Sequence, residues 1–339
     1  MKLLQPIQTV ILLSISVAVL CSCQKKSYLY DEGTAFNTAY HLTYLSKEEL
    51  QPGIDSVLTK FDAALSMFNP NSTLSQINRS GIQPFDLRHQ PWVERVIEKS
   101  LDYSKLTGGA FDMTVAPLVN AWGFGFKKSA TISQAYIDSL LTFVGYQLIS
   151  LKDGQLVKAD PRVCLDASAV AKGYACDVVA DYLKSKGVTD YMIEIGGELA
   201  LSGKNPHGSD WRIGINTPTD DSLSMSEDWK EKLTLTDRCM ATSGNYRRFY
   251  IKDGKRYAHT IDPHTGYPVQ HSLLSATVIA GDGLTADALA TAFMVMGVEK
   301  ALPLAESLPD IEALFICSDS QDSTGMKVLT TSGIKQWQK

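Results

Sequence analysis

The sequence predicts a protein that mixes α-helices and β-strands along one chain. Residues 47–68 and 166–187 carry apolar side chains at the three- and four-residue spacing of helices that pack on a core. Residues 190–198 have the composition of a buried strand, and residues 211–215 alternate as a second strand. The chain is 44% hydrophobic and 20% charged, which is typical of a globular protein.

Length and charge limit the possible functions. At 339 residues the chain is long enough for one large domain or two. Its formal net charge of −5 argues against nucleic acid as a partner, because phosphate backbones are bound by basic surfaces. An anionic ligand would have to be bound by a few local charges.

Residues 1–22 have the features of an export signal. Lys2 supplies a short basic region, and an apolar run over residues 10–20 follows it. The run is too short to span a bilayer as a permanent helix. The small residue Ser22 directly before Cys23 resembles the cleavage box of bacterial lipoproteins, so we expect a lipid on Cys23.

Such a lipid would anchor the exported chain to a membrane, on the periplasmic side or at the cell surface. Residues 23–30 would then form a tether, and residues 31–339 would form the folded domain. A plain signal peptide and an uncleaved anchor are the alternatives.

The first half of the folded part alternates predicted elements with loops. Residues 34–44 have strand composition, and the helix at 47–68 ends where asparagine and proline follow it. Phe68 is left at the rim of that loop. A second helix, over residues 90–106, stops at a pair of glycines.

A turn-rich segment follows the second helix. Ala110, Phe111 and Asp112 come directly after the two glycines, and residues 122–126 are rich in aromatic residues and glycine. Taken alone, Asp112 is interpreted as a turn residue, because aspartate beside glycine favours turns.

The helix over residues 166–187 carries a wide apolar stripe and ends at a glycine. The small residues of its first turn leave backbone N–H groups accessible, and such a helix N-terminus attracts anions. Lys172 would strengthen that attraction. Asp166 and Ser168 are also explained as helix caps.

The helix that begins near Gly281 places Asp287 and Thr291 four residues apart and therefore on one face. Carboxylate and hydroxyl oxygens suit Mg²⁺, which takes few protein ligands and shares the rest with phosphates and water. An ordinary helix face carries the same pair, so the spacing alone does not identify a metal site.

One segment in the second half concentrates aromatic and basic side chains in a predicted β-hairpin. Asp253-Gly254 favours a two-residue turn, which pairs Tyr250 with Tyr257 and Arg248 with His259. These four side chains then share one face of the ribbon, and that face could bind a planar anion. A solvated sheet face is the alternative.

The residues after this hairpin support a role for His259. The run from Asp262 to Gly266 predicts a turn that holds His259 and Ile261 at a strand end. The charge of Arg248 across the ribbon would disfavour protonation of the imidazole, which leaves a neutral base at pH 7.

The cysteines outside the signal form no CxxC pair, which argues against zinc and thioredoxin-like chemistry. Buried free thiols are therefore expected at Cys164, Cys176, Cys239 and Cys317.

Taken together, these segments resemble the ApbE-type FAD:protein FMN transferases. The resemblance extends from Gly33 to Gly297, and the order and number of its motifs make it specific. The motifs are residues 66–72, 108–112, 117–119 with 122–125, 166–177, 194–198, the hairpin, and residues 286–291.

The resemblance implies a role for individual residues. At two positions the chain departs from the family pattern: Phe68 stands where many members have tyrosine, and Glu32 stands where a Met-Gly-Thr start is common. His259 stands at the family's functional histidine. The backbone carbonyl of Ala169 and the side chains of Asp287 and Thr291 are implied as Mg²⁺ ligands. The implied FAD contacts are Phe68, Ala110, Phe111, Asp112, Asp166, Lys172 and Ile261.

The same resemblance implies an α+β fold of two related lobes, with the FAD cleft between them. The implied reaction is Mg²⁺-dependent transfer of FMN from FAD to a threonine hydroxyl of an acceptor protein, with release of AMP. The implied acceptors are subunits of membrane electron-transfer complexes. A Mg²⁺-dependent FAD pyrophosphatase and a non-catalytic flavin-binding lipoprotein are the alternatives.

Overall fold

A computed structural model of the chain describes residues 25–125, 132–218, 229–245, 249–252, 255–322 and 324–338. The expected signal and Cys23 lie outside these ranges. No helix within them is both long and apolar enough to cross a bilayer.

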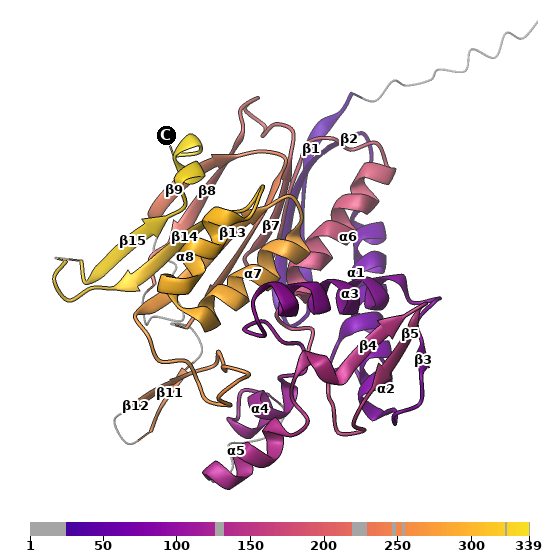
Figure 1. The fold of residues 1–339 in the computed structure, drawn as a ribbon. Coiled ribbons are helices and arrows are strands. Elements are labelled where there is room, and N and C mark those ends of the chain that lie inside the picture. Colours follow the sequence, from indigo (N-terminus) through magenta and orange to yellow (C-terminus); the bar gives the residue numbers. More distant parts are fainter. Residues whose placement is uncertain are drawn as a thin grey trace, which may run out of the picture.

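The fold is α+β, as the resemblance implied, and its centre is an antiparallel sheet of eight strands (Figure 1). Each strand of this sheet pairs antiparallel with the strands next to it. In spatial order the strands are β1 (Ser27–Ala35), β2 (Thr38–Ser46), β6 (Tyr191–Ile195), β7 (Glu198–Ser202), β10 (Arg238–Gly244), β13 (Leu273–Ala280), β14 (Glu312–Ser318) and β15 (Met326–Thr330).

The sheet consists of two halves with the same plan, in which two strands, then helices, then two strands follow one another. The first half contains β1, β2, β6 and β7 with helices α1 (Gln51–Leu65) and α6 (Ala171–Ser185). The second contains β10, β13, β14 and β15 with α7 (Gly283–Met296) and α8 (Val298–Ser307). The halves share one continuous sheet, because β7 pairs with β10.

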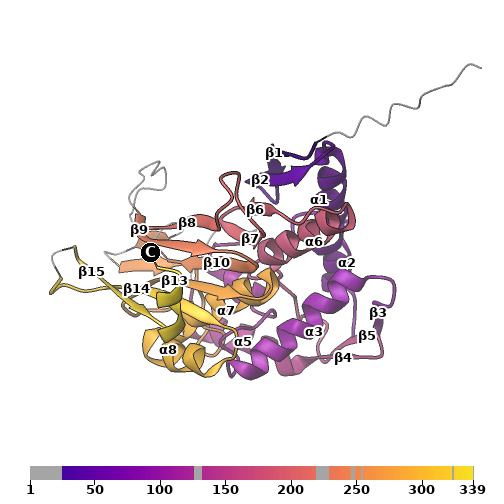
Figure 2. The same ribbon diagram turned by 90° about the horizontal axis from the view of Figure 1, so that it is seen from above.

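Alternating side chains give the sheet two buried faces. On one face Ala241, Val278 and Phe315 pack beneath the helices. On the other face their neighbours Met240 and Ile279 pack beneath a two-stranded ribbon of β8 (Trp211–Asn216) and β9 (Trp229–Leu235). Figure 2 shows α7 and α8 on one side of the sheet and this ribbon on the other.

A smaller part is inserted between β2 and β6. It contains a three-stranded sheet and lies beneath the main sheet in Figure 1. Its elements are α2 (Thr73–Arg79), β3 (Phe85–Asp86), α3 (Pro91–Leu106), α4 (Ala116–Ala121), α5 (Gln134–Leu141), a 3₁₀ turn (Tyr146–Leu148), β4 (Ile149–Lys152) and β5 (Gln155–Lys158). A second 3₁₀ turn (Ser332–Gln336) follows β15.

The N-terminal strands differ from the prediction. Residues 34–44 were expected as one strand, but Phe36 and Asn37 form a turn with φ of 53° and 59° between β1 and β2. Since both residues need a positive φ and neither is glycine, the turn has no strong sequence signal. β1 begins at Ser27, so residues 27–30 of the expected tether belong to the sheet.

Helix α6 begins later than predicted, at Ala171 rather than near Asp166. The carboxylate of Asp166 accepts hydrogen bonds from the backbone N–H of Ser168 at 2.8 Å and from its hydroxyl at 2.5 Å. These bonds favour a turn over a helix, so residues 166–170 form a loop that leads into α6.

The predicted hairpin is confirmed as β11 (Phe249–Lys252) and β12 (Lys255–Ala258), with Tyr250 opposite Tyr257. Arg248 and Asp253-Gly254 lie outside the described residues, so the pairing of Arg248 with His259 stays a prediction.

The turn after the hairpin has the predicted chemistry. Asp262 accepts a hydrogen bond from the backbone N–H of His264 at 2.9 Å, and Gly266 has a φ of +73°. The carbonyl of Asp262 also accepts from the N–H of Gly266 at 2.8 Å. The imidazole of His264 contacts the carbonyl oxygen of Gly108 at 2.9 Å, so the turn is fixed to the loop after α3.

The expected free thiols are found at Cys164, Cys176, Cys239 and Cys317. Cys176, Cys239 and Cys317 are buried, whereas Cys164 is only half-buried.

Helices α6 and α7 approach each other closely at a pair of glycines. A methyl group on Gly173 would overlap the carbonyl oxygen of Gly283 and lie 2.7 Å from the Cβ of Asp287. Asp177 of α6 accepts hydrogen bonds from the backbone N–H groups of Gly283 at 2.7 Å and Leu284 at 3.0 Å. One helix therefore caps the start of the other.

We expect Gly173→Ala to lower the stability of the protein, although alanine in a helix interior is usually more stable than glycine by about 0.5–1 kcal/mol. The reason is the overlap with Gly283, which would push the two helices apart. Urea unfolding measures the change. The control is Gly81→Ala, whose added methyl group meets no atom within 4 Å. A Gly173→Ala protein at least as stable as the parent would contradict this packing.

Candidate functional site

A cleft of about 720 Å³ opens where the two halves of the sheet meet the smaller part. Its walls come from segments far apart in the sequence. They include the β1–β2 turn, the loop after α3, the loop and first turn of α6, the β6–β7 turn, β8, the end of β10, α7 and residues 259–261.

The structure brings together ten of the eleven candidate residues of the folded part. Phe68 is the exception: it does not line the cleft, and it is 67% exposed in the loop between α1 and α2. Its implied contact with FAD stays a prediction. The ten residues in the cleft are Ala110, Phe111, Asp112, Asp166, Ala169, Lys172, His259, Ile261, Asp287 and Thr291.

Lys172, which is half-buried, forms an ion pair with a buried carboxylate that the sequence did not predict. Its ammonium lies 2.5 Å from Oε1 of Glu198, which is the first residue of β7. Burial works to lower the pKa of Lys172, but the carboxylates of Asp287 and Glu198 outweigh it and raise that pKa. Burial raises the pKa of Glu198, and Lys172 opposes that effect. The lysine therefore carries its charge at the cleft.

Asp287 projects from α7 toward the start of α6. Its Oδ2 accepts a hydrogen bond from the backbone N–H of Gly173 at 3.0 Å, and the residue is only 5% exposed. Thr291, one turn further along α7, lies 3.4 Å from the hydroxyl of Ser243. Ala169, in the loop before α6, lines the same cleft.

These groups fit a hard cation. A carboxylate, a threonine hydroxyl and a backbone carbonyl all supply the oxygen ligands that Mg²⁺ prefers. Among the described residues no group of three or more His, Cys, Asp or Glu side chains could hold a metal. A cation here would therefore depend on few protein ligands.

Asp112 and Asp166 shape loops that line the cleft. Asp112 accepts hydrogen bonds from the backbone N–H groups of Thr114 at 2.8 Å and Tyr146 at 2.7 Å. Burial raises the pKa of both carboxyls, and hydrogen bonds from Thr114 and Ser168 oppose the rise. The turn interpretation of Asp112 is confirmed, and the same residue lines the cleft.

His259 directly follows β12 and lines the cleft with Thr260 and Ile261. Its ring meets the ring of Phe124 edge-on at 6.3 Å. The hydroxyl of the next residue, Thr260, donates to the side chain of Asn245 at 2.6 Å. This bond connects the segment to the end of β10.

Glu198 and Glu194 were not predicted as site residues. Both belong to the motif at residues 194–198. The sequence indicates this motif but assigns neither glutamate a role in the site. Glu194 accepts a hydrogen bond from the backbone N–H of Gly197 at 2.5 Å and thereby holds the turn before Glu198. No local pattern indicates the ion pair, because Lys172 and Glu198 are 26 residues apart in the chain.

The fold and the site define an α+β protein whose cleft combines a half-buried lysine, the start of a helix and a set of oxygen donors. This is a class of site that suits a phosphate-bearing ligand.

Comparisons with known proteins identify the family. The model of the ApbE family matches residues 36–315. A FAD:protein FMN transferase of Vibrio cholerae is 36% identical over 302 residues, which cover 86% of this chain and 89% of the relative. One from Haemophilus influenzae is 35% identical over 329 residues, or 92% of this chain and 94% of the relative.

Solved structures agree with this result. The flavin transferase ApbE from Vibrio cholerae matches with a TM-score of 0.82 at 34% identity, covering 92% of this chain and 99% of that chain. The apo form of the Pseudomonas stutzeri flavinyl transferase ApbE matches with a TM-score of 0.81 at 32% identity, covering 92% and 97%. The chain belongs to the ApbE family.

The cap formed by Asp177 predicts a pH-dependent contribution to stability. Burial raises its pKa from 3.8 to about 6, against hydrogen bonds from Gly283 and Leu284 that lower it. Because the folded state binds this proton more tightly than the unfolded state, the wild type should gain stability relative to Asp177→Asn as the pH falls through 6. The gain between pH 7 and pH 4.5 is about 2 kcal/mol.

Urea unfolding of both proteins at the two pH values measures this gain. Asp181→Asn is the control, because that carboxylate lies on the same helix with 78% of its side chain exposed. A stability difference between wild type and Asp177→Asn that is the same at both pH values would refute the raised pKa.

Proposed function

We propose that this chain transfers FMN from FAD to a threonine hydroxyl of an acceptor protein and releases AMP. One observation carries the proposal: ten of the eleven residues that the family resemblance implies for this reaction line a single cleft. Membership of the ApbE family supports the same reaction.

FAD is the substrate, and its two phosphates must be bound by a protein with a net charge of −5. Lys172 supplies a fixed positive charge within the cleft. The N-terminal end of α6 adds the partial positive charge of the helix dipole. Glu198 holds the lysine side chain in place on the β7 side.

Ala169, Asp287 and Thr291 would hold a Mg²⁺ ion beside these phosphates. Bound there, the ion would neutralise charge that builds up on the phosphate oxygens during transfer. Asp287 is held for this role by its hydrogen bond from Gly173.

His259 is the proposed general base. The threonine oxygen attacks the phosphorus nearer the riboflavin and forms a phosphoester bond. The bond between that phosphorus and the bridging oxygen breaks, and AMP leaves with this oxygen. A ring nitrogen of His259 accepts the proton that the threonine hydroxyl loses.

We also propose that the enzyme is exported and anchored by a lipid on Cys23. The support is the sequence of residues 1–23, which resembles a lipoprotein signal. The anchor would hold the cleft near membrane electron-transfer complexes, whose threonine-bearing subunits are the proposed acceptors.

The test incubates the protein with FAD, Mg²⁺ and a threonine-bearing subunit of such a complex, and then measures the mass of the subunit. A gain equal to the mass of bound FMN supports transfer. Free FMN and AMP with an unchanged subunit would identify a pyrophosphatase instead. Intact FAD would indicate a flavin-binding protein without catalysis.

Asp287→Ala should abolish turnover while FAD still binds. The loop that carries Ala110, Phe111 and Asp112 makes its contacts without this carboxylate, whereas the proposed ion depends on it. Calorimetric titration with FAD and a turnover assay over a range of Mg²⁺ concentrations separate the two effects. Glu299→Ala, an exposed carboxylate on the next helix, is the control. Mg²⁺-dependent turnover by Asp287→Ala would remove this residue from the ion site.

His259→Ala should slow transfer by about 10²- to 10⁴-fold, the usual effect of losing a general base, and should leave FAD affinity nearly unchanged. Single-turnover kinetics and FAD titration measure the two quantities. The control is His89→Ala, an exposed histidine away from the cleft. Equal losses in FAD affinity and in rate would show that His259 binds a phosphate and does not take the proton.

A further inference from the structure

One edge of β8 faces the cleft. The five successive residues from Arg212 to Asn216 all line it. Side chains of a strand alternate between its two faces, so five lining residues in a row require that the cleft reaches the edge of the strand as well. The backbone of β8 is therefore part of the wall.

The register identifies which backbone groups lie at this edge. Thr234 of β9 is opposite Arg212, and its N–H donates to the carbonyl of Trp337 at 2.9 Å, away from β8. In an antiparallel ladder the N–H and C=O of one residue point to the same side, and the side alternates along the strand. The N–H and C=O groups of Arg212 and Gly214 therefore point away from β9.

The edge of β8 that points away from β9 has no partner strand in the described ranges, where the ribbon contains β8 and β9 alone. Strand β6 of the main sheet extends from the ribbon to the cleft. Met192 packs against the apolar cluster under the ribbon, and Glu194, two residues further on the same face, lines the cleft. His41 of β2 lies 2.6 Å from Glu194 with 57% of its side chain exposed. The face of β6 that carries Met192 and Glu194 thus connects the ribbon with the cleft.

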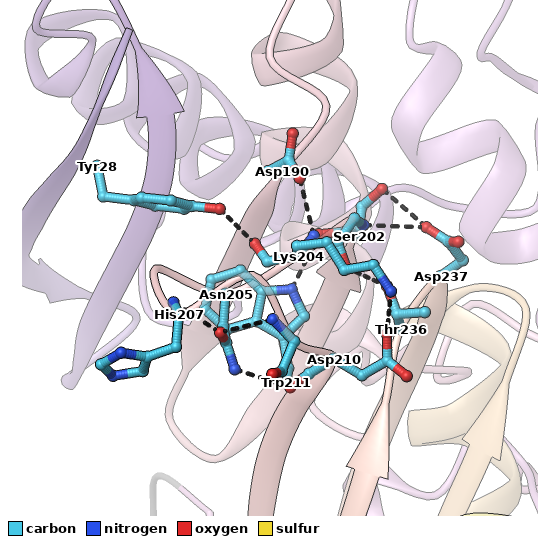
Figure 3. A network of polar contacts seen from close by, with 12 residues as sticks. Tyr28, Asp190, Ser202, Lys204, Asn205, His207, Asp210, Trp211, Thr236 and Asp237 are labelled. Carbon is cyan, nitrogen blue, oxygen red and sulfur yellow. Dashed lines mark hydrogen bonds and ion pairs between the residues drawn. The ribbon is translucent and has the colours of Figure 1, made fainter.

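A polar network fixes the beginning of β8 (Figure 3). The hydroxyl of Tyr28 donates to the carbonyl of Lys204 at 2.6 Å, and the N–H of Lys204 donates to Asp190 at 2.8 Å. The indole of Trp211 donates to the carbonyl of Ser202 at 2.9 Å. These bonds tie the loop before β8 to β1 and to the main sheet, so the edge is held in position before any partner binds.

We propose that the free edge of β8 binds the acceptor protein, whose threonine segment adds as a third strand beside β8 and β9. The inference rests on the proposed function. A threonine must enter a cleft that also holds FAD, and an extended segment is much narrower than a helix of about 10 Å diameter. Main-chain hydrogen bonds to Arg212 and Gly214 would provide affinity, and the face of β6 that carries Met192 and Glu194 would guide the segment into the cleft.

The first test uses the unaltered enzyme. Synthetic peptides centred on the modified threonine of the acceptor, and long enough to pair with the six residues of β8, carry a single N-methyl group at each position in turn. Strand addition predicts an alternating pattern: methylation of N–H groups that face β8 lowers kcat/KM by about tenfold, the loss of a good hydrogen bond, and methylation between them changes it little. A pattern without alternation would overturn the proposal.

The second test changes the enzyme. Gly214→Pro removes an N–H that β9 does not use, so the ribbon should fold, as its melting temperature will show. KM for the acceptor should rise about tenfold, and FAD affinity should stay unchanged. Gly81→Pro is the control, because Ser80 before it already has the extended ψ of 157° that a following proline favours.

Other occupants of the edge give different results. A loss of FAD affinity in Gly214→Pro would assign the edge to FAD, and a halved mass in light scattering would assign it to a second copy of the chain; either result overturns the proposal. If the wild-type enzyme labels no acceptor, the proposed function fails and this inference fails with it. If the acceptor is labelled, and neither Gly214→Pro nor N-methylation changes that labelling, then the inference is contradicted and the proposed function still stands.

Discussion

The close approach of α6 and α7 is the constraint on which the site depends. Because Gly173 and Gly283 carry no side chains, the two helices meet with their backbones in contact. The carboxylate of Asp287 can then accept the N–H of Gly173, and Asp177 can cap α7. The two halves of the sheet each contribute one of these helices, so the glycine contact joins the repeated halves at the cleft.

The charge distribution follows from this contact. The chain is acidic as a whole, yet its substrate would bring two phosphates into the cleft. Lys172 remains charged because Asp287 and Glu198 lie beside it, although burial alone would favour its neutral form. Two carboxylates beside a single lysine leave a net negative charge. A bound cation would therefore complement Lys172 rather than compete with it.

Local patterns predicted much of this structure, and long-range contacts account for the rest. The Asp253-Gly254 signal predicted the register of the hairpin, and apolar periodicity located α1 and α3, because both depend only on neighbouring residues. The β1–β2 turn was missed since its positive-φ residues are not glycines. The partnership of Lys172 with Glu198 could not be seen, because it exists only when a helix and a strand pack together.

The most direct test of this account is the position of the cation. A crystal of the protein with FAD and Mn²⁺ in place of Mg²⁺ gives an anomalous difference map in which the ion alone is strong. The account predicts one peak coordinated by the oxygens of Ala169, Asp287 and Thr291, next to the phosphates of FAD. A peak elsewhere in the cleft, with these three residues uncoordinated, would contradict it.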